Sequence, residues 1–164
     1  MVLRNLVLDL DNTLIFGFRQ DQPNFLDIDL SKGVKVGDYL FFIRPYCYEF
    51  LDYIFRKYNV GIFTAATKLY ADDVIDTFFL KYKKHLHFVF IKEEYDKCKF
   101  ATGGVKDINF ICSEVPHFLP TETMIIDDCY GVKYTNMDRA IQVTHWIPAR
   151  EDKDDQLLRL MKEI

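Results

Sequence analysis

Runs of consecutive apolar residues alternate along the chain with stretches in which apolar residues recur every three or four positions. The runs predict buried strands at 3–10, 59–63, 87–91, 123–127 and 140–143. The stretches predict amphipathic helices over about 45–58, 71–82 and 157–164. Strands that are joined through helices of about a dozen residues pair in parallel. The pattern therefore predicts an α/β fold, a Rossmann-like central parallel sheet with helices on both faces.

Two regions depart from this alternation. Polar and apolar residues alternate over 25–30, and short apolar runs follow at 34–36 and 39–43, each after a turn. These three segments predict a small antiparallel β insertion at about 25–43. Residues 92–121 show no clear periodicity, so no element is predicted there.

The composition is that of a globular protein. The 164 residues lie within the roughly 100–200 of one domain, so we expect a single domain over 1–164. Apolar residues make up 49% of the chain, including fifteen Phe and ten Tyr, which argues against disorder. There is no signal peptide, and no apolar run approaches the ~20 residues that span a bilayer. We expect no association with a membrane.

Charge and cysteine content narrow the functional classes. A net charge of −4 gives no footprint for general nucleic-acid binding, so we expect no direct contact with nucleic acid. The four cysteines have no C-x-x-C spacing and are too sparse for a disulfide scaffold. We therefore expect a soluble, intracellular protein, cytoplasmic or nuclear, with a monomer favoured and no zinc site.

Polar residues stand where three of the predicted strands end. Asp9 and Asp11 close the first strand, Thr64 follows the strand at 59–63, and Asp127 with Asp128 closes the strand at 123–127. Because the carboxyl ends of parallel strands lie at one edge of a sheet, these side chains are expected to converge. Crowded carboxylates repel one another unless a cation lies between them, and a set of oxygen donors suits Mg²⁺. Since Mg²⁺ keeps waters and substrate phosphates among its ligands, the substrate is expected to be phosphorylated.

The spacing of the first two aspartates suits group transfer. Residues two apart on a strand share a face, so Asp9 and Asp11 can reach the same bound group. One carboxylate can attack phosphorus while the other handles the proton of the leaving group. Each residue also has an ordinary structural explanation, since D-x-D is common in turns and Thr64 is a common helix N-cap. Four histidines lack any surrounding motif and are assigned no chemistry: His85, His87, His117 and His145.

The motifs, taken in order, resemble one known family. "DLDNTL" at 9–14 resembles the D-x-D-x-T signature of haloacid dehalogenase-type aspartate phosphatases, in the branch of the small phosphatases of the RNA polymerase II carboxy-terminal domain. "FTAATKLYADDVID", "GGVKDI" and "IIDDCYG" resemble that branch's second, lysine and final metal motifs. The similarity covers nearly the whole chain. It implies a haloacid dehalogenase-like fold with no large cap domain.

The resemblance also implies roles for the first motif. Asp9 corresponds to the nucleophile and to a Mg²⁺ ligand. Asp11 corresponds to the general acid and base, and its backbone carbonyl also faces the metal. Thr13 corresponds to the residue that stabilises the loop after the nucleophile.

The later motifs carry the remaining roles that the resemblance implies. Thr64 and Lys106 correspond to the residues that hold the transferred phosphoryl oxygens. Asp128 corresponds to a Mg²⁺ ligand, and Asp127 to the residue that supports Lys106 and a metal-bound water. Many members of the branch carry Asp-Asn where this chain has Asp127-Asp128, so which of the two binds the metal directly stays open.

Three functional hypotheses remain at this stage. The resemblance favours a Mg²⁺-dependent phosphatase for phosphoserine or phosphothreonine in a protein or peptide, such as the polymerase tail. The second hypothesis is the same chemistry on a small metabolite or a nucleic-acid terminal phosphate, and the third is a non-catalytic binding scaffold. The presence of Asp9 and Asp11 argues against the third. Apolar residues of the insertion either line a substrate groove beside the site or pack on the sheet: Leu26, Ile28, Val34 and Val36.

Overall fold

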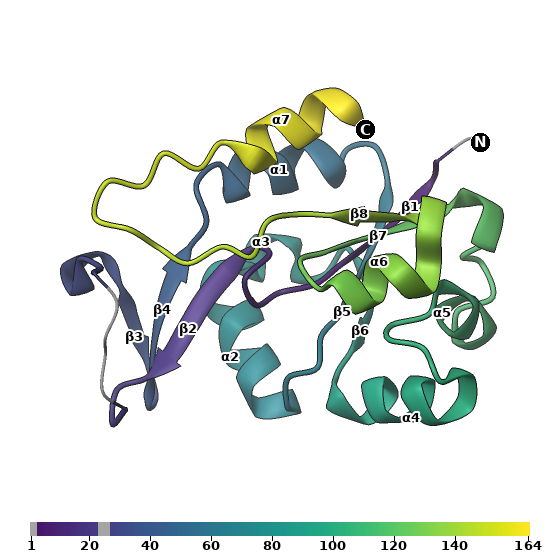
Figure 1. Cartoon of the computed structure of the whole chain (residues 1–164), viewed down its shortest axis with the longest axis horizontal. Coiled ribbons are helices and arrows are strands. Elements are labelled where there is room, and N and C mark those ends of the chain that lie inside the picture. The colour runs from purple at the N-terminus through teal and green to yellow at the C-terminus, as the bar shows by residue number, and fades with distance from the viewer. Residues whose placement is uncertain (1–2, 23–26) are drawn as a thin grey trace.

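The computed structural model of the chain describes residues 3–22 and 27–164. Its centre is a five-stranded sheet in the order β6-β5-β1-β7-β8 (Figure 1). The strands are β1 (Asn5–Leu8), β5 (Asn59–Phe63), β6 (Leu86–Phe90), β7 (Thr123–Asp127) and β8 (Ala140–Gln142). Every neighbouring pair is parallel, so the carboxyl ends lie at one edge. The predicted parallel sheet is confirmed.

Helices cover both faces of this sheet (Figure 1). One face packs against α1 (Cys47–Ile54), α2 (Lys68–Phe78), α3 (Leu80–Lys83) and α7 (Gln156–Glu163). The other face packs against α4 (Lys92–Thr102), α5 (Ile108–Glu114) and α6 (Tyr130–Asn136). The longest of these helices have 11 residues, and none in the described part of the chain is long and apolar enough to cross a membrane.

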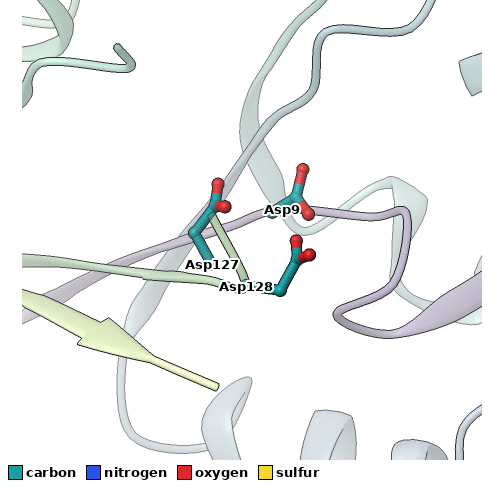
Figure 2. Close-up of side chains that lie close together, drawn as sticks. All are labelled: Asp9, Asp127 and Asp128. Carbon is teal, nitrogen blue, oxygen red and sulfur yellow. The ribbon is translucent and has the colours of Figure 1, made fainter. Parts of the chain in front are cut away.

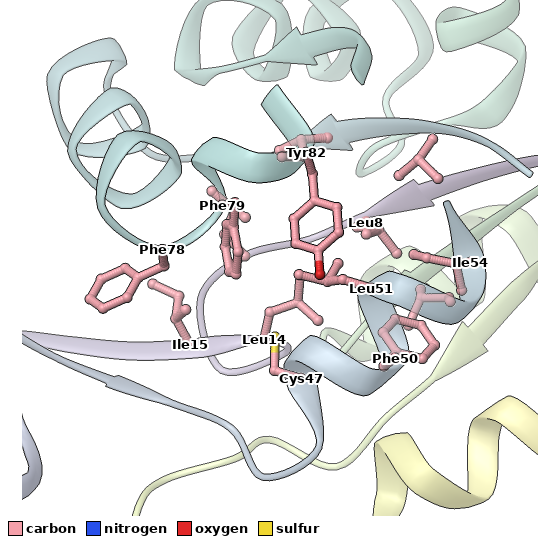
Figure 3. Packing of buried hydrophobic residues seen from close by; sticks show 14 of the residues in the cluster. Leu8, Leu14, Ile15, Cys47, Phe50, Leu51, Ile54, Phe78, Phe79 and Tyr82 are labelled. Atoms are coloured by element: carbon pink, nitrogen blue, oxygen red, sulfur yellow. The ribbon is translucent and has the colours of Figure 1, made fainter. Parts of the chain in front are cut away.

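Side-chain alternation along β1 divides the hydrophobic core in two. Leu6 and Leu8 pack in the core under α1, α2 and α7, whereas Val7 packs in the core under α4, α5 and α6. Figure 3 shows the first core, in which Leu51 of α1 and Tyr82 of α3 lie around Leu8. Full burial of each such leucine contributes roughly 1.5–3 kcal/mol. Both faces of β1 are thus buried, which explains its unbroken apolar sequence.

A second, antiparallel sheet has the order β2-β4-β3. Its strands are β2 (Ile15–Arg19), β3 (Val34–Val36) and β4 (Tyr39–Ile43). The insertion is therefore larger than the predicted 25–43, because it begins directly after the loop that follows β1. The pattern missed β2, in which Gly17 lies so close to the Phe41 ring that a Cβ would be 2.5 Å from it.

The strand predicted at 25–30 is wrong where it can be compared. Residues 23–26 lie outside the described residues, and Asp27 to Asp29 form no strand. Leu30–Lys32 is a 3-10 turn, η1, and the Asp29 carboxylate accepts a hydrogen bond from its Ser31 N–H. Such local hydrogen bonds from side chains to the backbone compete with strand pairing. The strand was predicted from the alternation of polar and apolar residues, which does not take these hydrogen bonds into account.

The unassigned region 92–121 forms α4, α5 and most of the 3-10 turn η2 (Pro120–Glu122). Only Cys98 is buried in α4, and only Ile108 and Ile111 in α5. Periodicity cannot be read from so few buried positions. The helix predicted over 71–82 starts at Lys68 and is interrupted at Phe79 between α2 and α3. A further 3-10 turn, η3 (Met137–Arg139), joins α6 to β8.

The apolar residues of the insertion mainly pack against the body of the protein. Leu26 lies outside the described residues. Ile28 is buried with Phe42 and Trp146, and Val36 packs against the first core. Val34 is 43% exposed and lines a cavity of about 220 Å³ beside Trp146.

A buried arginine ties this insertion to the end of the chain. The side chain of Arg44 has no exposed area, and its guanidinium donates to both carboxylate oxygens of Asp154 at 2.9 and 3.0 Å. It also donates to the Thr144 hydroxyl, the Gln156 side chain and the Thr13 carbonyl, at 2.9 to 3.1 Å. Paired bonds of this geometry are among the strongest in proteins. Arg44 therefore fixes the loop between Asp9 and Thr13 against the segment before α7.

Arg44→Met is expected to lower the free energy of unfolding by ~3–5 kcal/mol, because it leaves Asp154 without its cation. The matched control is Arg159→Met, which breaks the exposed pair with Asp155 and should cost about 1 kcal/mol at most. Urea unfolding followed by circular dichroism measures both. Equal, small changes in the two variants would show that Arg44 does not hold the segments together.

Candidate active site

The polar strand ends converge at the carboxyl edge of the parallel sheet. Asp9 follows β1, Thr64 follows β5, and Asp127 is the last residue of β7. These strands are adjacent in the order β5-β1-β7. Beside them lies a cavity of about 550 Å³, whose lining includes every predicted site residue except Thr13: Asp9, Asp11, Thr64, Lys106, Asp127 and Asp128.

Lys106 bridges two buried carboxylates at the base of the cavity. Its Nζ donates to Asp9 Oδ1 at 2.5 Å and to Asp127 Oδ2 at 2.6 Å. The loop that carries it is held by Asn136 of α6, whose amide donates to the Lys106 carbonyl at 3.1 Å and accepts from the Ile108 N–H at 2.8 Å. Lys106 has φ +49°, a conformation that a non-glycine residue keeps only where its surroundings enforce it. The contacts with Asn136 of α6 thus hold the loop in the conformation that directs Lys106 to the two carboxylates.

The cluster of Lys106, Asp9 and Asp127 has more negative than positive groups. Burial raises the pKa of Asp9 to about 8, although the neighbouring Lys106 lowers it. Burial likewise raises the pKa of Asp127. Burial alone would lower the pKa of Lys106, but the Asp9 and Asp127 carboxylates raise it above its usual value. One ammonium therefore serves two buried carboxylates, and further positive charge would favour the ionised forms of both.

Three carboxylates lie together as a candidate metal centre. Asp9, Asp127 and Asp128 each place an oxygen within 4.8 Å of the others (Figure 2). The donors are all hard oxygens, and burial penalises their negative charge unless a cation compensates it. These residues therefore fit Mg²⁺. The carboxylate of Asp11 is not part of this group.

Thr13 connects two members of the cluster. Its hydroxyl donates to Asp9 Oδ2 at 2.9 Å and accepts from the Asp128 N–H at 3.1 Å. Thr13 is completely buried and lies in the middle of the turn at 12–14 that leads to β2. The threonine therefore holds the loop after Asp9 against the end of β7.

Asp11 projects toward α2, where the Tyr70 hydroxyl donates to its Oδ1. Burial raises the pKa of Asp11, whereas the Tyr70 hydrogen bond opposes that rise. Both side chains line the cavity, so the proton-carrying group predicted by the sequence lies beside the space available to a substrate. Tyr70 was not predicted, although its position in the second motif and in the first turn of α2 could have indicated it.

Thr64 is the first residue of the loop between β5 and α2. Its hydroxyl accepts from the Ala66 N–H at 3.1 Å, and its own N–H donates to the Phe90 carbonyl of β6 at 2.9 Å. The N-cap of α2 is Thr67, so the N-cap interpretation of Thr64 is wrong. Thr64 instead shapes the loop that borders the cavity.

Further residues at this site escaped the sequence analysis. Tyr39 of β4 and Tyr95 of α4 line the cavity together with Tyr70 and Cys129. His145, to which no chemistry was assigned, places Nδ1 at 2.6 Å from Asp128 Oδ2. Tyr70 and Cys129 lie inside quoted motifs but were given no role, whereas Tyr39, Tyr95 and His145 come from the insertion, from α4 and from the loop after β8.

Comparison with known families shows to which family the chain belongs. A family model described as "NLI interacting factor-like phosphatase" matches residues 4–164. The chain belongs to this family. The resemblance to the phosphatases of the polymerase carboxy-terminal domain is thereby confirmed, and the chain is a member of a phosphatase family.

Individual relatives of this member of the family come from viruses and from cellular organisms. It is 29% identical over 184 residues to the putative CTD phosphatase-like protein 355R of Invertebrate iridescent virus 6, covering 99% of this chain and 97% of the viral protein. It is 32% identical over 173 residues to nuclear envelope morphology protein 1 of Saccharomyces cerevisiae, covering 96% of this chain and 37% of the yeast protein. The chain thus matches almost all of the viral relative but little more than a third of the yeast one.

Solved structures support the fold of the family. The fission yeast RNA polymerase II CTD phosphatase Fcp1, in a variant bound to beryllium fluoride, superposes with a TM-score of 0.64 at 19% sequence identity. The superposition covers 98% of this chain and 49% of the Fcp1 chain. The phosphatase fold therefore accounts for about half of that longer protein.

Proposed function

We propose that this protein is a Mg²⁺-dependent phosphatase that works through an aspartyl-phosphate on Asp9. The observation that carries the proposal is the convergence of Asp9, Asp11, Lys106 and the Asp127-Asp128 pair on one open cavity at the carboxyl edge of the sheet. Membership of a phosphatase family supports the reaction class.

Asp9 and Asp11 divide the chemistry between them. The Asp9 carboxylate attacks phosphorus, the bond from phosphorus to the ester oxygen breaks, and Asp11 gives its proton to the departing oxygen. In the second half, water loses a proton to Asp11 and attacks phosphorus, and the bond from phosphorus to Asp9 breaks. Inorganic phosphate leaves and both aspartates return to their starting states.

Neutralisation of the phosphoryl oxygens comes from the surrounding groups, since phosphoryl transfer depends mainly on positioning and charge. Lys106 supplies a buried positive charge beside Asp9, and Thr64 also lines the cavity. Asp9, Asp128 and the backbone carbonyl of Asp11 would hold Mg²⁺, with Asp127 supporting Lys106. When bound, Mg²⁺ supplies further positive charge to the transferred group.

A phosphorylated protein or peptide is the substrate class that we favour. The cavity of about 550 Å³ is open to solvent and is bordered by the small sheet β2-β4-β3 through Tyr39. An open site of this kind admits an extended segment with a phosphoserine or phosphothreonine. The names of relatives, such as the CTD phosphatase-like protein 355R and Fcp1, point to the same substrate class. We further propose an intracellular site of action, cytoplasmic or nuclear.

A small phosphorylated metabolite or a nucleic-acid terminal phosphate remains the second candidate, because the same open cavity accepts it. Rates of phosphate release from a phosphoserine and phosphothreonine peptide panel, set beside a panel of sugar, nucleotide and DNA-end phosphates, separate the two. We expect kcat/KM for the best peptide to exceed that for the best small molecule by at least about tenfold, the size of one modest binding difference. The reverse order would replace the substrate class while leaving the chemistry in place.

Chelation is expected to abolish phosphatase activity, and added Mg²⁺ to restore it. Ca²⁺ should bind the same carboxylates but support little turnover, because its larger and more variable shell misplaces the transferred group. Initial rates after treatment with a chelator, followed by return of each ion, give the measurement. Full activity after exhaustive chelation would remove the metal from the mechanism.

A further inference from the structure

His145 contacts the outer edge of the candidate metal centre. Its Nδ1 donates to Asp128 Oδ2 at 2.6 Å, since a carboxylate oxygen can only accept. The side chain of Asp128 is 14% exposed, whereas that of His145 is 59% exposed and does not line the cavity. The contact therefore engages one oxygen of Asp128 from outside the cavity.

The other oxygen of Asp128 has a weaker partner. Thr13 Oγ1 lies 3.3 Å from Asp128 Oδ1 but only 2.9 Å from Asp9 Oδ2. A hydroxyl carries one proton, and the shorter distance directs it to Asp9. Among the described residues, His145 is thus the closest side-chain donor to Asp128. It occupies Oδ2 and leaves Oδ1, the oxygen on the side of Thr13 and Asp9, to the metal centre.

The backbone on both sides of His145 is anchored. Before it, the Thr144 N–H and hydroxyl donate to Gln156 Oε1 at 2.7 and 2.6 Å. After it, the Trp146 N–H donates to the Asn12 carbonyl and the Asn12 amide donates to the Trp146 carbonyl, both at 2.9 Å. Asn12 lies in the loop between Asp11 and Thr13. Because the backbone is already fixed, His145 loses little further entropy when it binds Asp128.

We propose that His145 is a positioning residue that orients Asp128 for Mg²⁺ binding. Partners of ligating carboxylates commonly contribute 10–100-fold to metal affinity. The inference rests on the proposed function, because it concerns the metal centre of that mechanism. It assigns a task to a side chain that no motif of the sequence marks.

Binding of Mn²⁺, a spectroscopic substitute for Mg²⁺, tests this proposal directly. Titrations followed by electron paramagnetic resonance should give a Kd for His145→Ala that is about 10-fold or more above wild type. His145→Asn keeps an N–H donor near the place of Nδ1 and should restore most of the affinity. The Mg²⁺ concentration for half-maximal activity should shift in parallel, while kcat at saturating Mg²⁺ stays near wild type.

The sign of the change separates positioning from a simple charge effect. If His145 acted only as a nearby positive charge, its removal would strengthen Mn²⁺ binding. His85→Ala is the control, since His85 is exposed at the amino end of β6, away from the cavity. Circular dichroism verifies that each variant is folded at the temperature of the titration.

Each outcome has a defined meaning. Failure of the wild-type protein to bind Mn²⁺ contradicts the metal centre of the proposed function itself. Wild-type binding with a Kd for His145→Ala within about twofold, well below the 10–100-fold range, overturns the positioning role alone. Equal weakening in His145→Ala and His145→Asn also overturns it, because a hydrogen-bond donor would then make no difference.

Discussion

Asp9→Asn is expected to reduce turnover of an aryl phosphate by a factor on the order of 10⁴ or more, because removal of a catalytic nucleophile commonly lowers kcat by such factors. The amide keeps the shape of the side chain but cannot form the acyl-phosphate bond. Burial disfavours the negative charge of the Asp9 carboxylate, so its replacement by a neutral amide is expected to leave the fold intact. Steady-state rates at saturating Mg²⁺ give the comparison.

The control for this variant is Asp52→Asn, which changes an exposed carboxylate of α1 that pairs with Lys81. That change should leave the rate near wild type. Unfolding midpoints of both variants show whether the fold is retained. More than a few per cent of the wild-type rate in folded, metal-loaded Asp9→Asn would mean that another group attacks phosphorus.

Asp11→Asn is expected to slow esters with poor leaving groups far more than activated ones. General acid catalysis contributes about 10²–10⁴ where the leaving oxygen needs a proton, and little where it does not. The quantity to compare is kcat/KM, which reports the steps up to departure of the leaving group and not the later hydrolysis that both substrates share. A phosphoserine peptide should lose about 10²-fold or more in kcat/KM, and a nitrophenyl phosphate less than about tenfold. The ratio of the two losses is the measured quantity, with the nitrophenyl ester as the internal control. Equal losses on both substrates would show that Asp11 transfers no proton in the first step.

The sequence was sufficient to predict the edge of the sheet at which the polar residues meet. Runs such as 59–63 and 123–127 are buried on both faces, so their apolar residues are unbroken and their ends are sharp. Parallel order then determines that Asp9, Thr64 and Asp127 end side by side. The positions of these three residues were thus predicted from the order of the strands and their parallel pairing. Lys106 was predicted only from the resemblance to the family, because no periodicity in the sequence places it in the cavity.

Other parts of the site depend on contacts between distant segments, which a local pattern does not encode. β2 pairs with β4 although residues 20–38 lie between them in the chain, and its Gly17 is explained only by the Phe41 ring that covers it. His145 reaches Asp128 because the loop after β8 is tied to Asn12 on the far side of the sequence. The pairing of β2 with β4 and the contact of His145 with Asp128 depend on tertiary packing. The pattern of apolar and polar residues in one sequence does not predict them.

Chemical trapping of the intermediate tests the central claim most directly. During turnover of a phosphopeptide with Mg²⁺, borohydride reduces an aspartyl-phosphate to the alcohol, and peptide mass spectrometry locates the changed residue. The mechanism predicts reduction at Asp9 and at no other aspartate, with none when substrate is omitted. Reduction at Asp11, Asp127 or Asp128, or none at all while phosphate is released, would contradict a covalent intermediate on Asp9.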